Sequence, residues 1–225
     1  MEALEKLAKL WPLLSKGIAE SLYMTVASTL MAYAIGLPLG IALVATDKGG
    51  LREMRIVNRI LGVLINIVRS VPFVILLVAI MPFTRLIVGT TLGSKATVVP
   101  LVVGAAPFIA RMVEGSLKEV DPGAIEAAQA MGASDARIIF SVMLVEARPS
   151  LVLGAAISIT TILAYSAMSG FVGGGGLGTI AINYGYYRYR SDVMLVTVTL
   201  LVVIVQAFQE IGMRLARYID KRART

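Results

Sequence analysis

Cysteine and histidine are both absent from this 225-residue chain. Their absence excludes a disulfide framework, a thiolate nucleophile, a histidine general base and any Cys/His metal site. The apolar segments also hold no carboxylate pair, Ser/Lys dyad or acidic cluster suited to a cation. We therefore predict no catalytic residue and no metal site, and we expect the chain not to be an enzyme.

Long polar intervals are also scarce. The chain is 57% hydrophobic with a mean hydropathy of +0.83, and several apolar runs approach the roughly 20 residues that a helix needs to cross a bilayer. The net charge is +7, but lysine and arginine stand at the ends of the apolar runs and form no single stripe. We therefore expect membrane lipid as a partner and no nucleic acid. The pattern predicts an all-α, multi-pass membrane protein.

Five membrane-spanning helices are expected, over residues 21–45, 56–81, 96–117, 150–171 and 191–213. Residues 1–20 carry an apolar helical face that includes Leu4, Leu7 and Trp11, which predicts a helix lying in the membrane interface. Gly36 and Gly40 form a GxxxG spacing in the first span. We interpret it as packing at a tolerated kink rather than as a dimerisation face.

The distribution of basic residues predicts the orientation of the spans. With the N-terminus outside and the C-terminus inside, the cytoplasmic set is Lys48, Arg52, Arg55, Arg59, Lys118, Arg137, Arg148, Arg214, Arg217, Lys221, Arg222 and Arg224. The external set is smaller: Lys6, Lys9, Lys16, Arg85, Lys95, Arg188 and Arg190. The positive-inside rule favours this N-out, C-in arrangement, which places the segment of residues 121–149 in the cytoplasm.

This segment, residues 121–149, is the longest polar interval between two apolar runs and predicts two short helices. Asp121 can cap the first helix, and Pro122 suits its first turn. Gly132 can end that helix in a left-handed conformation, and Ser134 can cap the next one. A compact cytoplasmic knob between two spans is typical of a docking element.

Three further features of the sequence contain glycine or charged residues. The glycine-rich stretch Gly173–Gly178 lacks the lysine and the preceding strand of a phosphate-binding loop, so we expect a tight external turn. Arg111 and Glu114 stand at an i,i+3 spacing near the end of the third span. Arg69 lies in the second span, where it either faces protein or water or extends to the membrane surface.

The polar segment resembles a known family motif. Glu126-Ala127-Ala128, three residues and then Gly132 resemble the EAA loop of the permease subunits of ABC importers. Val145 stands where the family has a proline, which leaves the second half of the loop less defined. Other stretches resemble the methionine-importer branch: NIVRSVPFVILL, MPFTRLIVGT, VPLVVGAAPFIARMVE, IEAAQAMGAS and YSAMSGFVGGGGLGTIAINYGY.

The resemblance implies a single permease domain over residues 1–225 with the type I importer fold, in the bacterial inner membrane. It implies a homodimer, two cytoplasmic ATPase subunits that hold ATP and Mg²⁺, an external methionine-binding (lipo)protein, and no cofactor in this chain. Methionine, D or L, would cross by alternating access. The coupling residues implied by the motif are Glu126, Ala127, Ala128, Gly132, Ala133 and Ser134.

The fourth span is the expected wall of the pathway because it is rich in small and hydroxylated residues. Met168 is flexible and polarisable, so a pair of them across a dimer axis could form a gate. Tyr165, Ser166 and Ser169 are candidate lining residues. Arg69 is expected to pair with a carboxylate of the protein, in preference to the substrate carboxyl group.

Two other functions stay open at this point. One is import of another small polar solute, such as a different amino acid or an osmolyte. The other is an ATPase-independent channel or secondary transporter, against which the spans lack the chain of ionisable residues that ion coupling usually needs.

Overall fold

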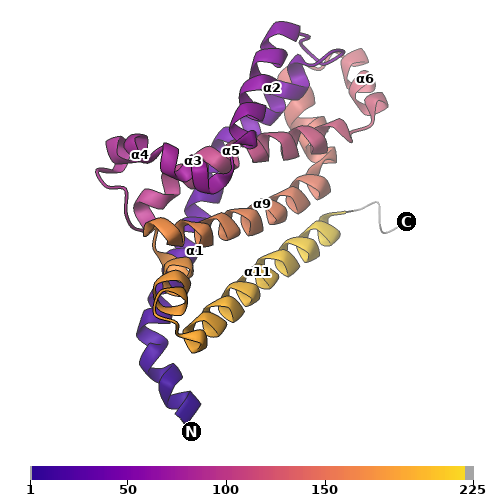
Figure 1. The fold of residues 1–225 in the computed structure, drawn as a ribbon. Helices are drawn as coiled ribbons and strands as arrows, with labels where there is room; N and C mark the ends of the chain where they lie inside the picture. Colours follow the sequence, from indigo (N-terminus) through magenta and orange to yellow (C-terminus); the bar gives the residue numbers. More distant parts are fainter. Residues whose placement is uncertain (1, 221–225) are drawn as a thin grey trace. The chain divides into compact units, whose positions relative to one another are not determined.

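The computed structural model describes the backbone of residues 2–220 and the side chains of residues 10–220. This part of the chain is helical and contains no strand. Figure 1 shows its elements, which are α1 (Glu2–Thr46), α2 (Arg55–Ser70), α3 (Phe73–Ala79), α4 (Met81–Val88), α5 (Ser94–Lys118), α6 (Pro122–Ala130), α7 (Asp135–Ile138), the π-helical η1 (Ile139–Met143), α8 (Leu144–Glu146), α9 (Arg148–Met168), the 3₁₀-helical η2 (Ser169–Val172), α10 (Gly176–Ile180), the π-helical η3 (Ala181–Tyr186) and α11 (Ser191–Ile219).

Four stretches are long and apolar enough to cross a membrane: Leu10–Thr46, Ser94–Lys118, Arg148–Tyr186 and Ser191–Ile219. Helices α2 and α3 form a pair that is bent by 99° at Val71 and Pro72, and the pair counts as a fifth span if it crosses the membrane as one unit. The interruption follows from the sequence, since proline removes a backbone donor and restricts the residue before it. The described part of the chain therefore agrees with the predicted five spans.

The N-terminal region differs from the prediction of a separate interfacial helix over residues 1–20. Helix α1 continues from Glu2 to Thr46 without a break. Leu14 is buried in a cluster with Leu177, Ile180 and Val193, while Trp11 is 57% exposed, so the part of this helix around Leu14 packs against protein. The side chains of residues 1–9, which include two of the predicted interfacial leucines, lie outside the described residues, as do the basic residues after position 220.

The contacts divide the chain into two units. Unit 1 comprises Met1–Met31, Val71–Gly104 and Ile159–Phe208, and unit 2 comprises Ala32–Ser70, Ala105–Ser158 and Gln209–Thr225. The Leu14 cluster is a core of unit 1. Unit 2 has its own buried cluster, made of Leu43, Ile65 and Ala110.

Gly36 and Gly40 bring α1 close to α5 inside unit 2. A Cβ atom added at Gly36 would lie 2.8 Å from the carbonyl oxygen of Ala106, and one at Gly40 would lie 2.7 Å from that of Ala110. Small residues at this spacing allow two backbones to approach. The GxxxG spacing therefore packs two helices of the same chain, and α1 continues through the proline between the two glycines.

Candidate functional site

The predicted caps of the segment of residues 121–149 are present in unit 2. The Asp121 carboxylate accepts the N–H of Gly123 at 3.0 Å at the start of α6. The Ser134 hydroxyl accepts the N–H of Arg137 at 3.4 Å at the start of α7. Each cap satisfies a backbone donor that the first helical turn leaves free. These two predictions are confirmed.

Gly132 ends α6 as predicted. Its φ is +76°, in the left-handed region that favours glycine. Its N–H donates to the carbonyl of Gln129 at 2.9 Å, and the N–H of Ala133 donates to the carbonyl of Ala128 at 3.1 Å. This pair of bonds is the Schellman motif, which closes the helix and sets the direction of the chain after it.

The surface of this segment is more apolar than the motif alone indicated. Glu126 and Ala127 are exposed, while Ala128 is buried. Met131 is 81% exposed and Phe140 is 65% exposed. Exposed apolar side chains beside a carboxylate are typical of a protein interface. Sequence reasoning missed Met131 and Phe140, although two large apolar residues in a polar interval were an available signal.

The segment is tied to the loop between α1 and α2. Arg52 Nε donates to Asp135 Oδ2 at 2.6 Å, which joins this loop to α7. Figure 1 shows α6 beside the same loop. A cavity of about 310 Å³ lies between them, and Asp47, Glu126 and Gln129 contribute to its lining. The segment of residues 121–149 is therefore fixed to the loop between α1 and α2 in unit 2.

A chain of charged contacts follows α5 from this loop. Lys118 Nζ lies 2.7 Å from Asp47 Oδ2 and 2.9 Å from Glu114 Oε1. Glu114 Oε2 lies 2.6 Å from Arg111 Nη1. Arg111 Nη2 then donates to Asn66 Oδ1 at 3.0 Å. The i,i+3 pair of Arg111 and Glu114 is therefore one part of a longer series that connects the loop between α1 and α2 with α2 itself.

Asp47 makes this series sensitive to acid. The hydrogen bond from Lys118 and then the N–H of Lys48 hold the pKa of the Asp47 carboxyl below its ordinary value. A lowered pKa stabilises the folded state above the ordinary value, and that contribution is lost as pH falls through the folded-state pKa. We expect Asp47→Asn to be slightly less stable than the wild type at pH 7, with the difference shrinking on acidification. Thermal unfolding of the purified protein from pH 7 to 3 measures this, and a difference independent of pH would contradict it.

The glycine-rich loop after α9 is held by three side chains of α1 and α5 within unit 1. The Glu20 carboxylate accepts the N–H of Gly176 at 2.7 Å, and the Ser21 hydroxyl accepts the next N–H at 2.9 Å. The Thr97 hydroxyl donates to the carbonyl of Gly174 at 3.0 Å. Sequence reasoning did not identify these partners, because they come from two distant helices and follow no local pattern.

Removing the carboxylate should loosen this loop. We expect Glu20→Ala to lower the free energy of unfolding by about 1–3 kcal/mol, because a largely covered N–H loses its charged acceptor. Lys16→Ala is the matched control, since Lys16 is exposed and lies 3.9 Å from the same carboxylate. Thermal unfolding of the two variants checks this, and equal effects would count against an anchoring role.

The predicted pathway residues lie in different surroundings. Tyr165 stacks on Phe73 with ring centroids 4.4 Å apart. Met168, the last residue of α9, is 42% exposed. Ser166 and Ser169 are buried and donate to carbonyls one turn earlier, at 2.7 and 2.6 Å. Exposure to a pathway would need a different conformation for these two serines, so their lining role stays a prediction.

Arg69 lies in the last turn of α2 and is exposed. The expected carboxylate partner is not found, since no side chain among residues 10–220 forms an ion pair or hydrogen bond with its guanidinium. Within this part of the chain Arg69 therefore forms no structural ion pair, and its role stays a prediction.

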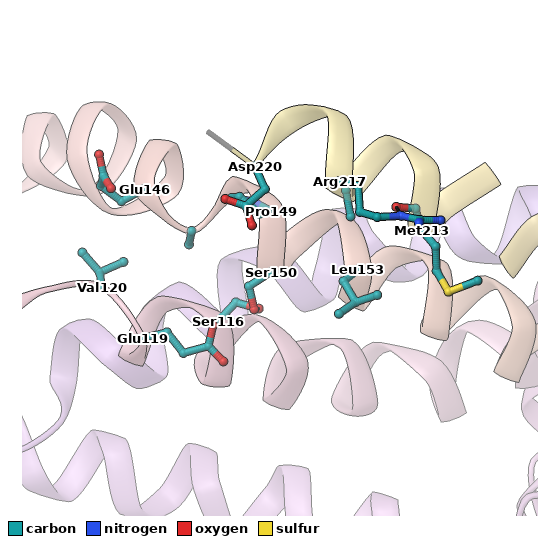
Figure 2. Close-up of a pocket in the computed structure, with 12 residues that line it drawn as sticks. Ser116, Glu119, Val120, Glu146, Pro149, Ser150, Leu153, Met213, Arg217 and Asp220 are labelled. Carbon is teal, nitrogen blue, oxygen red and sulfur yellow. Dashed lines mark hydrogen bonds between the residues drawn. The ribbon is translucent and has the colours of Figure 1, made fainter. Parts of the chain in front are cut away.

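A second cavity, of about 530 Å³, lies in unit 2 at the ends of α5, α9 and α11 (Figure 2). Ser150 Oγ donates to Ser116 Oγ at 3.0 Å on its wall. Its charged lining residues are Glu119, Glu146, Arg217 and Asp220. No group of three or more acidic residues within the described ranges is placed to hold a metal ion. None of the predicted coupling or pathway residues lines this cavity.

Comparison with known proteins decides the family. The profile of the family described as "binding-protein-dependent transport system inner membrane component" matches residues 36–225. The chain belongs to this family. As an inner-membrane component it is the permease subunit of an ABC importer, in which a separate subunit hydrolyses ATP.

Two relatives of this chain are both named as permease proteins for methionine transport. The probable D-methionine transport system permease protein MetI of Vibrio cholerae is 50% identical over 203 residues, 90% of each chain. The methionine import system permease protein MetP of Bacillus subtilis is 42% identical over 177 residues, 79% of this chain and 80% of the relative.

Solved structures give the same fold. An inward-facing structure of the MetNI methionine ABC transporter matches with a TM-score of 0.93 and 46% identity, over 95% of this chain and 99% of that one. An amino acid ABC transporter solved with histidines matches with a TM-score of 0.78 over 95% of this chain and 97% of that one. The identity in the second case is 19%, so that likeness concerns the fold alone.

Proposed function

We propose that this permease subunit forms the pathway through which an ATP-driven importer moves methionine across the bacterial inner membrane. The observation that carries the proposal is the 50% identity, over 90% of both chains, to a permease named for D-methionine transport. The TM-score of 0.93 to the methionine transporter supports the same assignment.

In this proposal the whole chain is one permease domain with the N-terminus outside and the C-terminus inside. It works as a homodimer with two cytoplasmic ATPase subunits, which bind ATP and Mg²⁺, and with an external methionine-binding protein. The excess of lysine and arginine on the inner loops supports the orientation.

Residues of α6 and the turn after it carry the coupling. The two caps and the Schellman motif make a compact element that can transmit a rigid-body movement of the ATPase subunits. Glu126, Ala127 and Met131 present the exposed contact face, and Gly132 sets the angle between α6 and α7. The tie between Arg52 and Asp135 passes the movement to the loop before α2.

Met168 is the proposed gate residue, since it is exposed at the end of α9 and its side chain adapts to different neighbours. Tyr165, one turn before Met168 in α9, stacks on Phe73. This contact fixes the face of α9 next to Met168. Ser166 and Ser169 support this turn through bonds to their own helix.

Uptake of labelled methionine into vesicles tests the proposal. The vesicles contain this chain, its ATPase subunit and ATP, with the binding protein added outside. We expect uptake only when all components are present. Flux through this chain alone, without ATP, would favour a channel, and uptake of a different solute only would replace methionine as the substrate.

A further inference from the structure

Arg69 is an arginine in a membrane span without a partner among the described side chains. It stands in the last turn of α2, is exposed, and belongs to the bent pair of α2 and α3, whose combined length and hydropathy suit a membrane span. A charged group in a span is costly unless it faces water, an opposite charge or a ligand. Its guanidinium donors are available to a group that does not belong to this chain.

Asn66, one turn earlier on α2, is held in a defined orientation. Arg111 Nη2 donates to Asn66 Oδ1 at 3.0 Å and to the carbonyl of Gly62 at 3.2 Å. A guanidinium can only donate, so the amide oxygen must face Arg111. The amide nitrogen therefore points away from Arg111, and no hydrogen bond from it is present among the described residues.

Arg111 is itself fixed by an acidic partner. Glu114 Oε2 lies 2.6 Å from Arg111 Nη1, and both side chains are largely covered. The charges of Arg111 and Glu114 offset each other, and those of Lys118 and Asp47 do so at 2.7 Å. Among the side chains of residues 10–220, Arg69 is then the positive charge at this end of α2 that has no counter-charge.

The free donors match the chemistry of a carboxylate. Asn66 and Arg69 are three residues apart, so their side chains share one face of α2. A neutral N–H group beside a guanidinium offers donors to both oxygens of a monoanion, and the single net charge suits a carboxylate better than a dianionic phosphate. The same charge repels an ammonium group, so the site distinguishes the two ends of an amino acid.

We propose that Asn66 and Arg69, with the amide of Asn66 oriented by Arg111, form a carboxylate-binding site for an amino acid in transit. The assignment to an amino acid rests on the proposed function. In this proposal Arg69 contacts the carboxyl group of the substrate. The sequence alone had favoured an ion pair between Arg69 and a carboxylate of the protein. The site is exposed, so it binds weakly and releases its ligand readily.

The absence of cysteine provides a direct test. Ser70 is exposed and adjacent to Arg69, so Ser70→Cys places the only thiol of this chain beside the site. The rate of its alkylation by neutral N-ethylmaleimide is measured in the complete permease–ATPase complex, with and without methionine. We expect methionine to slow alkylation by about threefold or more, and methioninol, which lacks the carboxylate, to have no effect.

Second substitutions in the same reporter identify the donors. Arg69→Gln should abolish protection by methionine, and Arg69→Lys should keep part of it. Arg59→Gln is the matched control, because Arg59 is another exposed arginine of α2 that has no partner among the described side chains, and protection should persist. Equal protection by methioninol, or persistence of protection in Arg69→Gln, would overturn the proposal.

A methionine-uptake measurement distinguishes failure of this site from failure of the proposed function. It also tests the site if the Ser70→Cys variant does not assemble. In complexes without the Ser70→Cys substitution, we expect Arg69→Gln to retain ATP hydrolysis that the binding protein stimulates. The amount of methionine taken up per ATP hydrolysed should fall about tenfold. Arg59→Gln should leave that ratio unchanged. Protection by several amino acids but by no amino alcohol would support the site and count against methionine as the substrate. An unchanged ratio in Arg69→Gln would overturn the site while leaving methionine import standing.

Discussion

Replacing Gly132 by valine is expected to leave the protein in the membrane and to reduce ATP-driven uptake by about tenfold or more, because a β-branched residue at positive φ is strongly disfavoured. The φ of Gly132 is +76° and no atom lies within 4 Å of an added Cβ, so the effect arises from the backbone rather than from a clash. Relaxing the strain would open the Schellman motif and change the direction of α7 relative to α6.

Gly115 is the matched control for this prediction. It also has no atom within 4 Å of an added Cβ, but it lies inside α5 and its φ is not positive. We expect Gly132→Ala to cost about 1 kcal/mol locally and Gly115→Ala to cost nothing, since alanine favours a helix over glycine. Co-purification with the ATPase subunit and uptake are the measurements. Normal docking and uptake in Gly132→Val would contradict the coupling role of the turn.

Reversing the charge of Glu126 tests the exposed face of α6 separately from its backbone. Glu126 is exposed, so Glu126→Arg should leave α6 intact while weakening attachment of the ATPase. Together with the Gly132 series, it distinguishes the shape of the turn from the charge that it presents.

Local features of this fold were accessible from the sequence because their causes lie within a few residues. The caps Asp121 and Ser134 and the left-handed Gly132 depend on hydrogen bonds between groups two to five residues apart. The spans depend on stretches of apolar residues, and the break before α3 depends on Pro72.

Features that depend on packing between distant segments were not accessible in the same way. Helix α1 runs through the expected interfacial region because Leu14 meets side chains more than 150 residues later in the chain. Ser166 and Ser169 looked suited to line a polar route, but in this conformation their hydroxyls bond to their own helix. The carboxylate of Glu20 acquires its role only when the glycine-rich loop folds against it.

The series of charges along α5 was only partly accessible from the sequence. The spacing of Arg111 and Glu114 predicted a pair, but neither the extension to Asp47 nor the contact with Asn66 followed from spacing. The same tertiary contacts decide whether Arg69 is paired, which is why a structural ion pair was the first expectation and a substrate contact is the better inference.

Glu114→Ala is expected to have the largest effect on stability of any single change in this series. Glu114 is buried and lies between Arg111 and Lys118 at 2.6 and 2.9 Å. Removing it leaves the guanidinium of Arg111 largely covered and without a counter-charge, which should cost about 3 kcal/mol or more. The change should appear as poor expression and as a lowered midpoint of thermal unfolding in detergent.

A second substitution in the same protein separates an unpaired charge from a lost packing contact. The double variant Arg111→Leu/Glu114→Leu removes both charges while keeping apolar volume, so we expect it to be more stable than either single leucine variant, because neither partner is left unpaired. Arg111→Leu also removes the hydrogen bond that orients Asn66. In the Ser70→Cys reporter, the double variant should therefore still unfold cooperatively, but methionine should no longer slow alkylation of the thiol. Additive losses in the double variant would contradict the coupling between the two side chains, and protection by methionine that persists in the double variant would contradict the role of Arg111 in orienting the amide of Asn66.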